Sequence, residues 1–308
     1  MSSFFLKKCR NTCEKRDDWR NYYYEQINRR WVEYVEEKVF YRNQLVNDIN
    51  IYYEFYPNPN SEKTLVLLHG FLSSTFSYRR LIPFLNKEYQ VVSIDLPPFG
   101  KSGKSNNFIY SYRNLAQTVI QLISTLGLRE ITLIGHSMGG QIVLNILHQQ
   151  PDLAQKAVLL CSSSYSKRSK LPLIIGSYIP YFHLYVKFFL ARSGIMQNLQ
   201  NVVHDHSLIS DEMLFGYLQP FLKDEIFLAL TRMIRDHEGD LSTVALNQIA
   251  HPCLLIWGEY DKVVPLSVGK RLKNDLRESE LVILRETGHL VPEERPEDVF
   301  QHIKQFLA

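Results

Sequence analysis

The chain has 308 residues, of which 45% are hydrophobic and 22% charged, values that are ordinary for a globular protein with a substantial core. A formal net charge of +3, without a stripe of arginines, does not favour nucleic acid as a partner. The short apolar stretch Phe4–Leu6 runs into charged residues and so does not predict a secretory signal, and four cysteines without a disulfide framework favour a reduced, cytoplasmic setting.

Residues 1–37 form a leader dense in charged and aromatic side chains, without proline or glycine. This composition predicts one or two amphipathic helices. Two roles stay open for such an N-terminal extension. It can pack on the body of the protein, or it can make a peripheral contact with a membrane surface or another protein.

Short apolar segments from about residue 38 onward predict strands, and the segments between them predict helices. Strand and helix alternate as far as residue 161 and again from residue 250 to the end. Near-continuous apolar strands in such an alternation are typical of an α/β protein with a mostly parallel sheet covered on both faces. The predicted strands are Lys38–Leu45, Asn50–Tyr56, Thr64–His69, Gln90–Asp95, Ile131–Ile134, Lys156–Cys161, Cys253–Trp257 and Glu280–Leu284.

The segment Gly135-His-Ser-Met-Gly139 lies between the strand beginning at Ile131 and a predicted helix that ends near His148. It matches the pattern G-x-S-x-G, in which small residues allow a sharp turn and present the serine hydroxyl at the mouth of a cleft. The positive end of the following helix would favour negative charge at the same place. Ser137 is therefore the candidate nucleophile.

The alternation breaks over residues 162–249, where a long apolar and aromatic stretch contains Pro172, Pro180, His183 and Lys187. These residues make a membrane-spanning helix a poor interpretation. We expect a helical cap inserted into the core, with its apolar side facing the cleft. The predicted organisation is a helical extension over 1–37, a core of 38–161 and 250–308, and a cap of 162–249.

A serine hydroxyl needs a base, and the base needs an acid to orient it. Asp261 follows the strand Cys253–Trp257, and His289 follows the strand Glu280–Leu284, so that both fall in loops beyond strand ends. The order Ser137, Asp261, His289 is the one expected of this architecture. Glu259 is the alternative acid.

Two backbone N–H groups are expected to form an oxyanion hole. One belongs to Met138, directly after the candidate nucleophile, and the other to Phe71 in the loop after the strand Thr64–His69. His136, beside Ser137, is expected to have a structural role. The pair His204 and His206 lacks further partners and is expected to be polar surface.

These motifs resemble those of capped serine hydrolases with the α/β-hydrolase fold. The resemblance covers residues 38 to 308 and rests on His69-Gly-Phe71, Asp95-Leu-Pro-Pro-Phe-Gly-Lys-Ser102, Gly135 to Gly140, Trp257 to Asp261, and Gly288-His289. It implies a sheet of about eight strands, a cap after the sixth strand, and neither a metal nor an organic cofactor. Pro98 stands where such proteins usually have glycine.

The resemblance implies hydrolysis of a carboxylic ester of a small hydrophobic substrate, through an acyl-enzyme on Ser137. Carbon–carbon, lactone or perhydrolase chemistry at the same triad is the alternative, as is a non-catalytic binding protein with this fold. The aspartate-nucleophile relatives are disfavoured by Ser137, and the carbon–carbon hydrolases mildly by His136, where they often have asparagine. The physiological substrate and the oligomeric state do not follow from the sequence.

Overall fold

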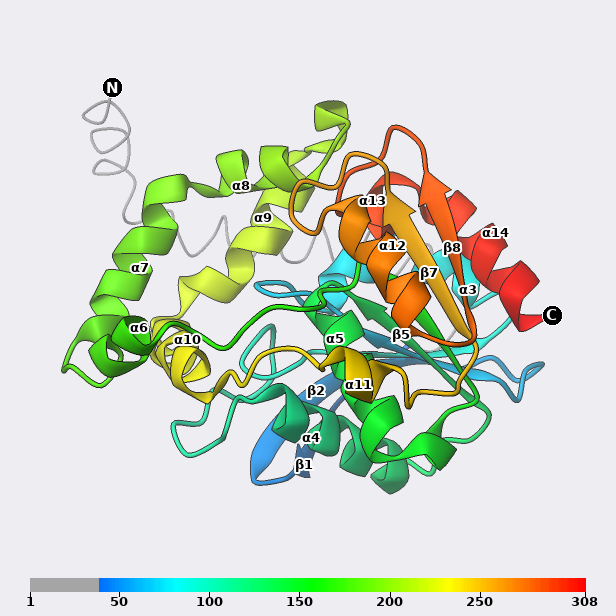
Figure 1. The fold of residues 1–308 in the computed structure, drawn as a ribbon, viewed down its shortest axis with the longest axis horizontal. Helices are drawn as coiled ribbons and strands as arrows, with labels where there is room; N and C mark the ends of the chain where they lie inside the picture. Colours follow the sequence, from blue (N-terminus) through cyan, green and yellow to red (C-terminus); the bar gives the residue numbers. More distant parts are fainter. Residues whose placement is uncertain (1–38) are drawn as a thin grey trace. The chain divides into compact units, whose positions relative to one another are not determined.

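The computed structural model describes residues 39–308, so the prediction of helices over residues 1–37 lies outside the described part. Within residues 39–308, eight strands form one sheet in the order β1-β2-β4-β3-β5-β6-β7-β8. The expectation of a mostly parallel, eight-stranded α/β sheet with helices on both faces is confirmed (Figure 1). The strands are β1 (Phe40–Val46), β2 (Ile49–Tyr56), β3 (Thr64–Leu68), β4 (Gln90–Ile94), β5 (Ile131–His136), β6 (Lys156–Leu160), β7 (Cys253–Gly258) and β8 (Ser279–Leu284).

Strands β3 to β8 are parallel to one another, whereas β2 pairs antiparallel with both β1 and β4. Every residue of β3, β5 and β7 is buried, as expected for central strands covered on both faces. Asn47 and Asp48 form the tight turn between β1 and β2 with φ angles of 50° and 59°. Asparagine and aspartate tolerate this left-handed conformation, which two-residue hairpin turns require.

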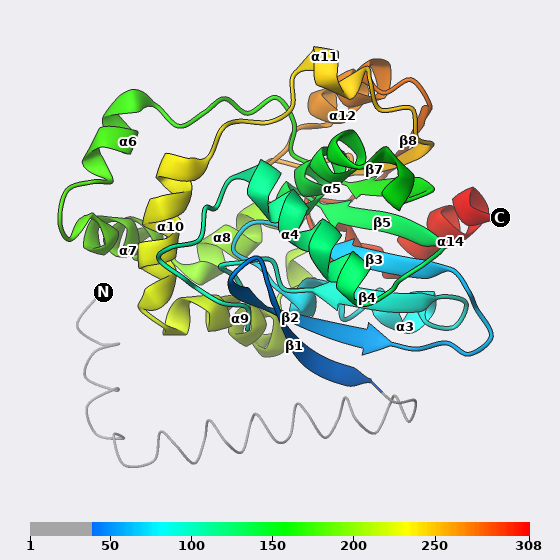
Figure 2. The same ribbon diagram turned by 90° about the horizontal axis from the view of Figure 1, so that it is seen from below.

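Helices α4, α5 and α12 cover one face of the sheet, and α3 and α14 cover the other (Figures 1 and 2). One predicted helix, up to about Leu85, is instead two short pieces, η2 and α3, separated by Arg79–Leu81. Pro83 lies in the first turn of α3, a position that tolerates its missing N–H. The helical segments of the core are η2 (Thr75–Tyr78), α3 (Ile82–Leu85), α4 (Tyr112–Thr125), α5 (Met138–Gln149), η3 (Pro151–Leu153), α12 (Leu266–Asp275), α13 (Val291–Glu294) and α14 (Pro296–Leu307).

Helical segments occupy the connection between β6 and β7. Most of them lie at one end of the sheet in Figure 1, where α7, α8 and α9 form an arch, whereas α11 lies beside α5. Among the helices of residues 39–308, none combines the length and apolar character needed to cross a bilayer. The segments are α6 (Leu171–Gly176), α7 (Phe182–Ser193), α8 (Ile195–Val202), η4 (His206–Leu208), α9 (Asp211–Leu218), η5 (Gln219–Leu222), α10 (Glu225–Asp236) and α11 (Thr243–Leu246).

The buried carboxylate of Asp95 ties together two loops at the carboxyl ends of the strands. One oxygen accepts a hydrogen bond from the backbone N–H of Thr75 and the other from that of Lys101, each at 2.7 Å. Thr75 belongs to the segment after β3 and Lys101 to the segment after β4. Asp95 therefore holds together the segments that follow the neighbouring strands β3 and β4, and the segment after β3 contains Phe71.

We predict that Asp95→Asn lowers the free energy of unfolding by about 1–3 kcal/mol. The amide keeps one oxygen as an acceptor, but its NH₂ group takes the place of the other, so that the backbone N–H of either Thr75 or Lys101 is left without an acceptor. Urea denaturation monitored by circular dichroism measures the change. Asp48→Asn is the matched control, since Asp48 is exposed in the β1–β2 turn. Equal stability of the two variants would contradict the proposed role of Asp95.

Candidate active site

Ser137 lies at the junction of β5 and α5 with φ of 52° and ψ of −118°, a backbone conformation that non-glycine residues rarely adopt. Its backbone is held from both sides. The N–H of Ser137 donates to the carbonyl of Leu160 at 2.9 Å, and the Ser137 carbonyl accepts from the N–H of Ser163 at 3.0 Å. The strained turn is therefore fixed by bonds to the end of β6 and to the loop after it.

The glycines that flank Ser137 are needed because other backbone lies against them. A Cβ atom on Gly139 would come within 2.0 Å of the Leu68 carbonyl oxygen, and one on Gly135 within 2.5 Å of the Gly139 carbonyl oxygen. Real Cβ atoms do not approach backbone so closely, so any side chain here would push α5 away from β3 and β5. The two glycines thus allow the first turn of α5 to approach the sheet.

Asp261 and His289 are brought together from loops that follow β7 and β8. His289 Nδ1 donates to Asp261 Oδ2 at 2.7 Å, and both side chains are buried. The other carboxylate oxygen of Asp261 accepts hydrogen bonds from the backbone N–H groups of Val263 and Val264, at 2.8 and 2.9 Å. The carboxylate plane is therefore fixed before any substrate arrives.

Glu259, the alternative acid, is exposed, and its carboxylate accepts from the backbone N–H of Glu286 at 3.3 Å. His289 bonds instead to Asp261. Within residues 39–308, no hydrogen bond joins the Ser137 hydroxyl to His289. Such bonds are often long in structures without substrate, so the assignment of Ser137, Asp261 and His289 as a catalytic triad stays a prediction.

His136 contacts the backbone of His289 rather than solvent. Its Nε2 lies 2.9 Å from the His289 carbonyl oxygen, and the two rings are 4.8 Å apart. Because a carbonyl only accepts, Nε2 carries the proton and Nδ1 does not. Burial, with the neighbouring His289, lowers the pKa of His136 to about 3, so that the ring is neutral at physiological pH.

His69 fixes the peptide that contains the expected Phe71 donor. His69 Nε2 accepts from the backbone N–H of Leu96 at 2.9 Å, so Nδ1 carries the proton and donates to the Gly70 carbonyl at 2.7 Å. That carbonyl belongs to the same planar unit as the Phe71 N–H, so fixing one fixes the other. Burial lowers the pKa of His69 to about 4, which keeps this neutral form.

The Phe71 loop lies against the serine. A Cβ atom on Gly70 would be 3.1 Å from the Ser137 Cβ, so the backbone here approaches the candidate nucleophile closely. Met138, whose N–H is the other expected donor, is the first residue of α5 and is buried. These positions are compatible with the predicted oxyanion hole, which remains a prediction.

The predicted cap, residues 162–249, contacts the His289 loop through backbone groups that sequence patterns did not reveal. The His289 N–H donates to the Val202 carbonyl, the last residue of α8, at 2.7 Å. The buried carboxylate of Glu294 accepts from the N–H groups of Gly288 and His204, at 3.0 and 2.8 Å. Glu294 lies in a short proline-containing segment, and no motif marks it as a bridge between loop and cap.

Cys161 is a second residue whose position the sequence did not indicate. Its thiol is buried, and its sulfur lies within 4.8 Å of the ligand atoms of Asp261 and His289. Burial, with the charge of Asp261, raises the pKa of the Cys161 thiol well above its ordinary value. These three side chains could hold a soft metal ion only if the bond between Asp261 and His289 were broken.

His204 stacks on Tyr260, and His206 bonds to the Gln200 carbonyl, so neither joins a metal-binding group among the described residues.

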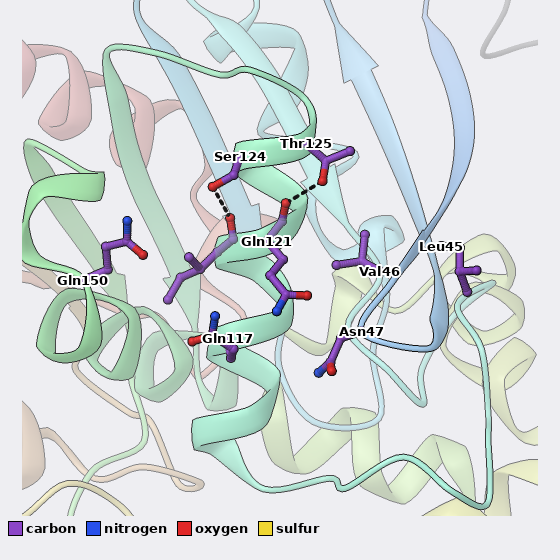
Figure 3. A pocket seen from close by; sticks show the side chains of 9 residues that line it. Leu45, Val46, Asn47, Gln117, Gln121, Ser124, Thr125 and Gln150 are labelled. Carbon is purple, nitrogen blue, oxygen red and sulfur yellow. Dashed lines mark hydrogen bonds between the residues drawn. The ribbon is translucent and has the colours of Figure 1, made fainter.

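A hollow of about 490 Å³ lies elsewhere, between the β1–β2 turn and α4 (Figure 3). Amides and hydroxyls such as Asn47, Gln117 and Gln121 contribute to its lining, which contains no charged side chain. The hydroxyls of Ser124 and Thr125 donate to carbonyls of their own helix. The lining of the hollow therefore offers neither a base nor an acid for proton transfer.

Comparison with known proteins agrees with the fold. Residues 63–198 match the profile of the family described as alpha/beta hydrolase fold, and residues 235–308 match one described as TAP-like protein. A Bacillus subtilis (strain 168) protein named "Uncharacterized hydrolase YugF" is 53% identical over 266 residues, which cover 86% of this chain and 97% of the relative.

Two more distant proteins widen the comparison. A 2-hydroxy-6-oxononadienedioate/2-hydroxy-6-oxononatrienedioate hydrolase from Paraburkholderia phymatum is 28% identical, with 80% of this chain and 88% of the relative covered. The crystal structure of a membrane phospholipase A is similar in fold, with a TM-score of 0.76, 22% identity, and coverage of 99% of this chain and 95% of the other. The chain belongs to the α/β-hydrolase family, and it is a hydrolase.

The neutral, buried His69 and His136 predict a loss of stability in acid. As the pH falls from about 6.5 towards 4, the unfolded chain takes up protons at both histidines while the folded chain does not, so the free energy of unfolding falls. Each histidine contributes at most about 1.4 kcal/mol per pH unit. Urea denaturation at pH 7.5 and 5.0 measures the fall, and His136→Gln should reduce it.

His148→Gln is the control for this experiment, because His148 is exposed at the end of α5. The control should lose as much stability between pH 7.5 and 5.0 as the parent chain does. If His136→Gln lost just as much, the neutral state of His136 in the fold would be refuted.

Proposed function

We propose that the protein hydrolyses a carboxylic ester of a small hydrophobic substrate through an acyl-enzyme on Ser137. The observation that carries this proposal is the 2.7 Å hydrogen bond between His289 and Asp261, at the edge of the sheet where Ser137 is presented. Because Nδ1 of His289 donates to Asp261, its Nε2 holds the lone pair and is the nitrogen able to accept a proton. This is the arrangement that a serine nucleophile needs.

In the proposed reaction, the Ser137 hydroxyl attacks the ester carbonyl while His289 Nε2 takes its proton. Negative charge develops on the carbonyl oxygen, where the N–H groups of Met138 and Phe71 stabilise it. His289 then gives the proton to the departing alcohol, leaving an acyl group on Ser137. Water, deprotonated by His289, attacks the acyl group; the bond to Ser137 breaks, His289 returns the proton to the serine oxygen, and the carboxylic acid is released. Asp261 stabilises the positively charged imidazole in both steps.

The second candidate is cleavage of a carbon–carbon bond at the same three side chains. The Paraburkholderia phymatum relative, whose name describes a 2-hydroxy-6-oxo dienedioate hydrolase, supports it. The same serine, histidine and aspartate would serve either bond, so the substrate decides between them. A panel of esters with varied acyl length, assayed beside a ring-cleavage product of this type, separates the two candidates.

We predict that Ser137→Ala lowers ester turnover by at least about 10³-fold, because removal of a triad member leaves only the oxyanion donors and substrate binding. Labelling by a fluorophosphonate should disappear with it. Ser267→Ala, a change on α12, should leave both turnover and labelling unchanged. Turnover by Ser137→Ala at the parent rate would reject the acyl-enzyme.

We predict that His69→Leu lowers kcat by about 10- to 100-fold with little change in KM, because it releases the peptide that presents the Phe71 N–H to the transition state. Fluorophosphonate labelling should become slower but still occur, since Ser137, Asp261 and His289 are intact. Thermal unfolding serves to select conditions in which the variant is folded. A rise in KM alone would assign His69 to substrate binding instead.

A further inference from the structure

Large apolar side chains are exposed in high density on α6, on α7 and on the turn between them. Each is between 40% and 75% exposed. Monomeric proteins seldom leave so continuous an apolar surface in water unless it binds something. We name it the cap patch, and it consists of Leu171, Leu173, Ile175, Tyr178, Ile179, Tyr181, Leu184, Tyr185, Phe188 and Phe189.

The part of the patch on α7 forms a single helical face. Leu184, Tyr185, Phe188 and Phe189 follow the spacing of one side of a helix, and the rings of Tyr185 and Phe189 stack at 6.4 Å. The opposite side of α7 packs on α10, where Val186 is buried. The core contact of α7 is thus already made, and the patch is an additional apolar surface.

The turn between the two helices extends the same surface. Tyr178, Ile179 and Tyr181 are all more than 60% exposed there. Both views place α6 and α7 at the end of the molecule remote from α14 (Figures 1 and 2). Tyrosine beside aliphatic side chains is the composition that favours the boundary between acyl chains and headgroups.

The segment that carries the patch is basic, although Lys187 of α7 pairs with Asp224, which lies just before α10, at 2.6 Å. From Leu153 to His204 the sequence contains no aspartate or glutamate, although the whole chain carries 32 acidic and 35 basic residues. Lys167, Arg168 and Lys170 lie just before α6, and Arg192 is exposed near the end of α7. Arg192 follows Phe188 by four residues and so lies on the patch side of the helix. The chemistry complementary to this surface is apolar at the centre and negatively charged around it.

We propose that the cap patch docks the protein on an anionic phospholipid bilayer. The aromatic and aliphatic side chains of α6, α7 and their turn enter the interface, and the flanking lysine and arginine side chains contact lipid phosphates. Two copies of this chain joined through the same patch would bring like charges together, which disfavours a dimer. The cap, which forms hydrogen bonds to the His289 loop, thereby lies at the lipid surface.

Binding to vesicles tests the proposal in the full chain. Ser137→Ala is the background, so that hydrolysis cannot alter the vesicles and the outcome does not depend on the proposed reaction. Co-sedimentation with phosphatidylcholine vesicles containing about 30% phosphatidylglycerol should show binding that weakens as salt rises. Tyr185→Ser, Phe188→Ser and Phe189→Ser together should weaken it at least about 10-fold. Leu45→Ser with Val244→Ser, exposed apolar residues outside the patch, is the matched control and should bind as the background does.

A second set of variants tests the charged rim without altering the apolar surface. Lys167→Gln, Arg168→Gln and Lys170→Gln should each weaken binding to the phosphatidylglycerol vesicles by about 5-fold. They should have little effect on vesicles of phosphatidylcholine alone. Because none of the three side chains is buried, thermal unfolding should be unchanged and serves as the check on folding.

Several outcomes would overturn the proposal. One is a background protein that does not bind the anionic vesicles. Another is a patch variant that binds them as well as the control does, as it would if residues 1–38 supplied the membrane contact or covered the patch. A third is a patch variant that changes only the mass measured by light scattering, which would assign the surface to contact between two copies.

Discussion

The hydrogen bond between His289 and Asp261 is the interaction around which the proposed chemistry is arranged. It assigns the proton to Nδ1 and so leaves Nε2 as the base. Much of the surrounding structure serves to keep it in place. Backbone N–H groups of the loop after β7 hold Asp261, while the His136 ring and the Val202 carbonyl hold the backbone of His289 on two sides. Because β7 and β8 are adjacent and parallel, two loops far apart in sequence meet at one edge of the sheet.

The sequence predicted the centre of the sheet well because β3, β5 and β7 are buried on both faces. Runs such as Thr64–Leu68 and Cys253–Gly258 are continuously apolar, so their limits could be placed within a residue or two. The candidate residues Ser137, Asp261 and His289 could be named because each follows a predicted strand closely, within a recognisable motif. The structure places Asp261 against His289 and leaves the bond to Ser137 unmade, so their catalytic roles stay predictions.

The sequence could not reveal interactions that depend on contacts remote along the chain. In the sequence Glu294 resembles an ordinary helical glutamate. In the structure its carboxylate accepts hydrogen bonds from the backbone N–H groups of Gly288, in the His289 loop, and His204, in the predicted cap. Cys161 lies in an apolar run that is typical of small buried residues, and only the fold places it beside Asp261. The sequence favours a cleft-facing position for the apolar stretch 171–191, yet many of its large side chains are exposed. Hydrophobicity shows that a side chain avoids water, but it does not show which neighbour replaces the water.

The bond from the His289 N–H to the carbonyl at the end of α8 has a mechanical consequence. A displacement of α8 that stretched this bond would pull on the peptide that carries the imidazole. The position of the His289 backbone is therefore coupled to that of α8 through this hydrogen bond.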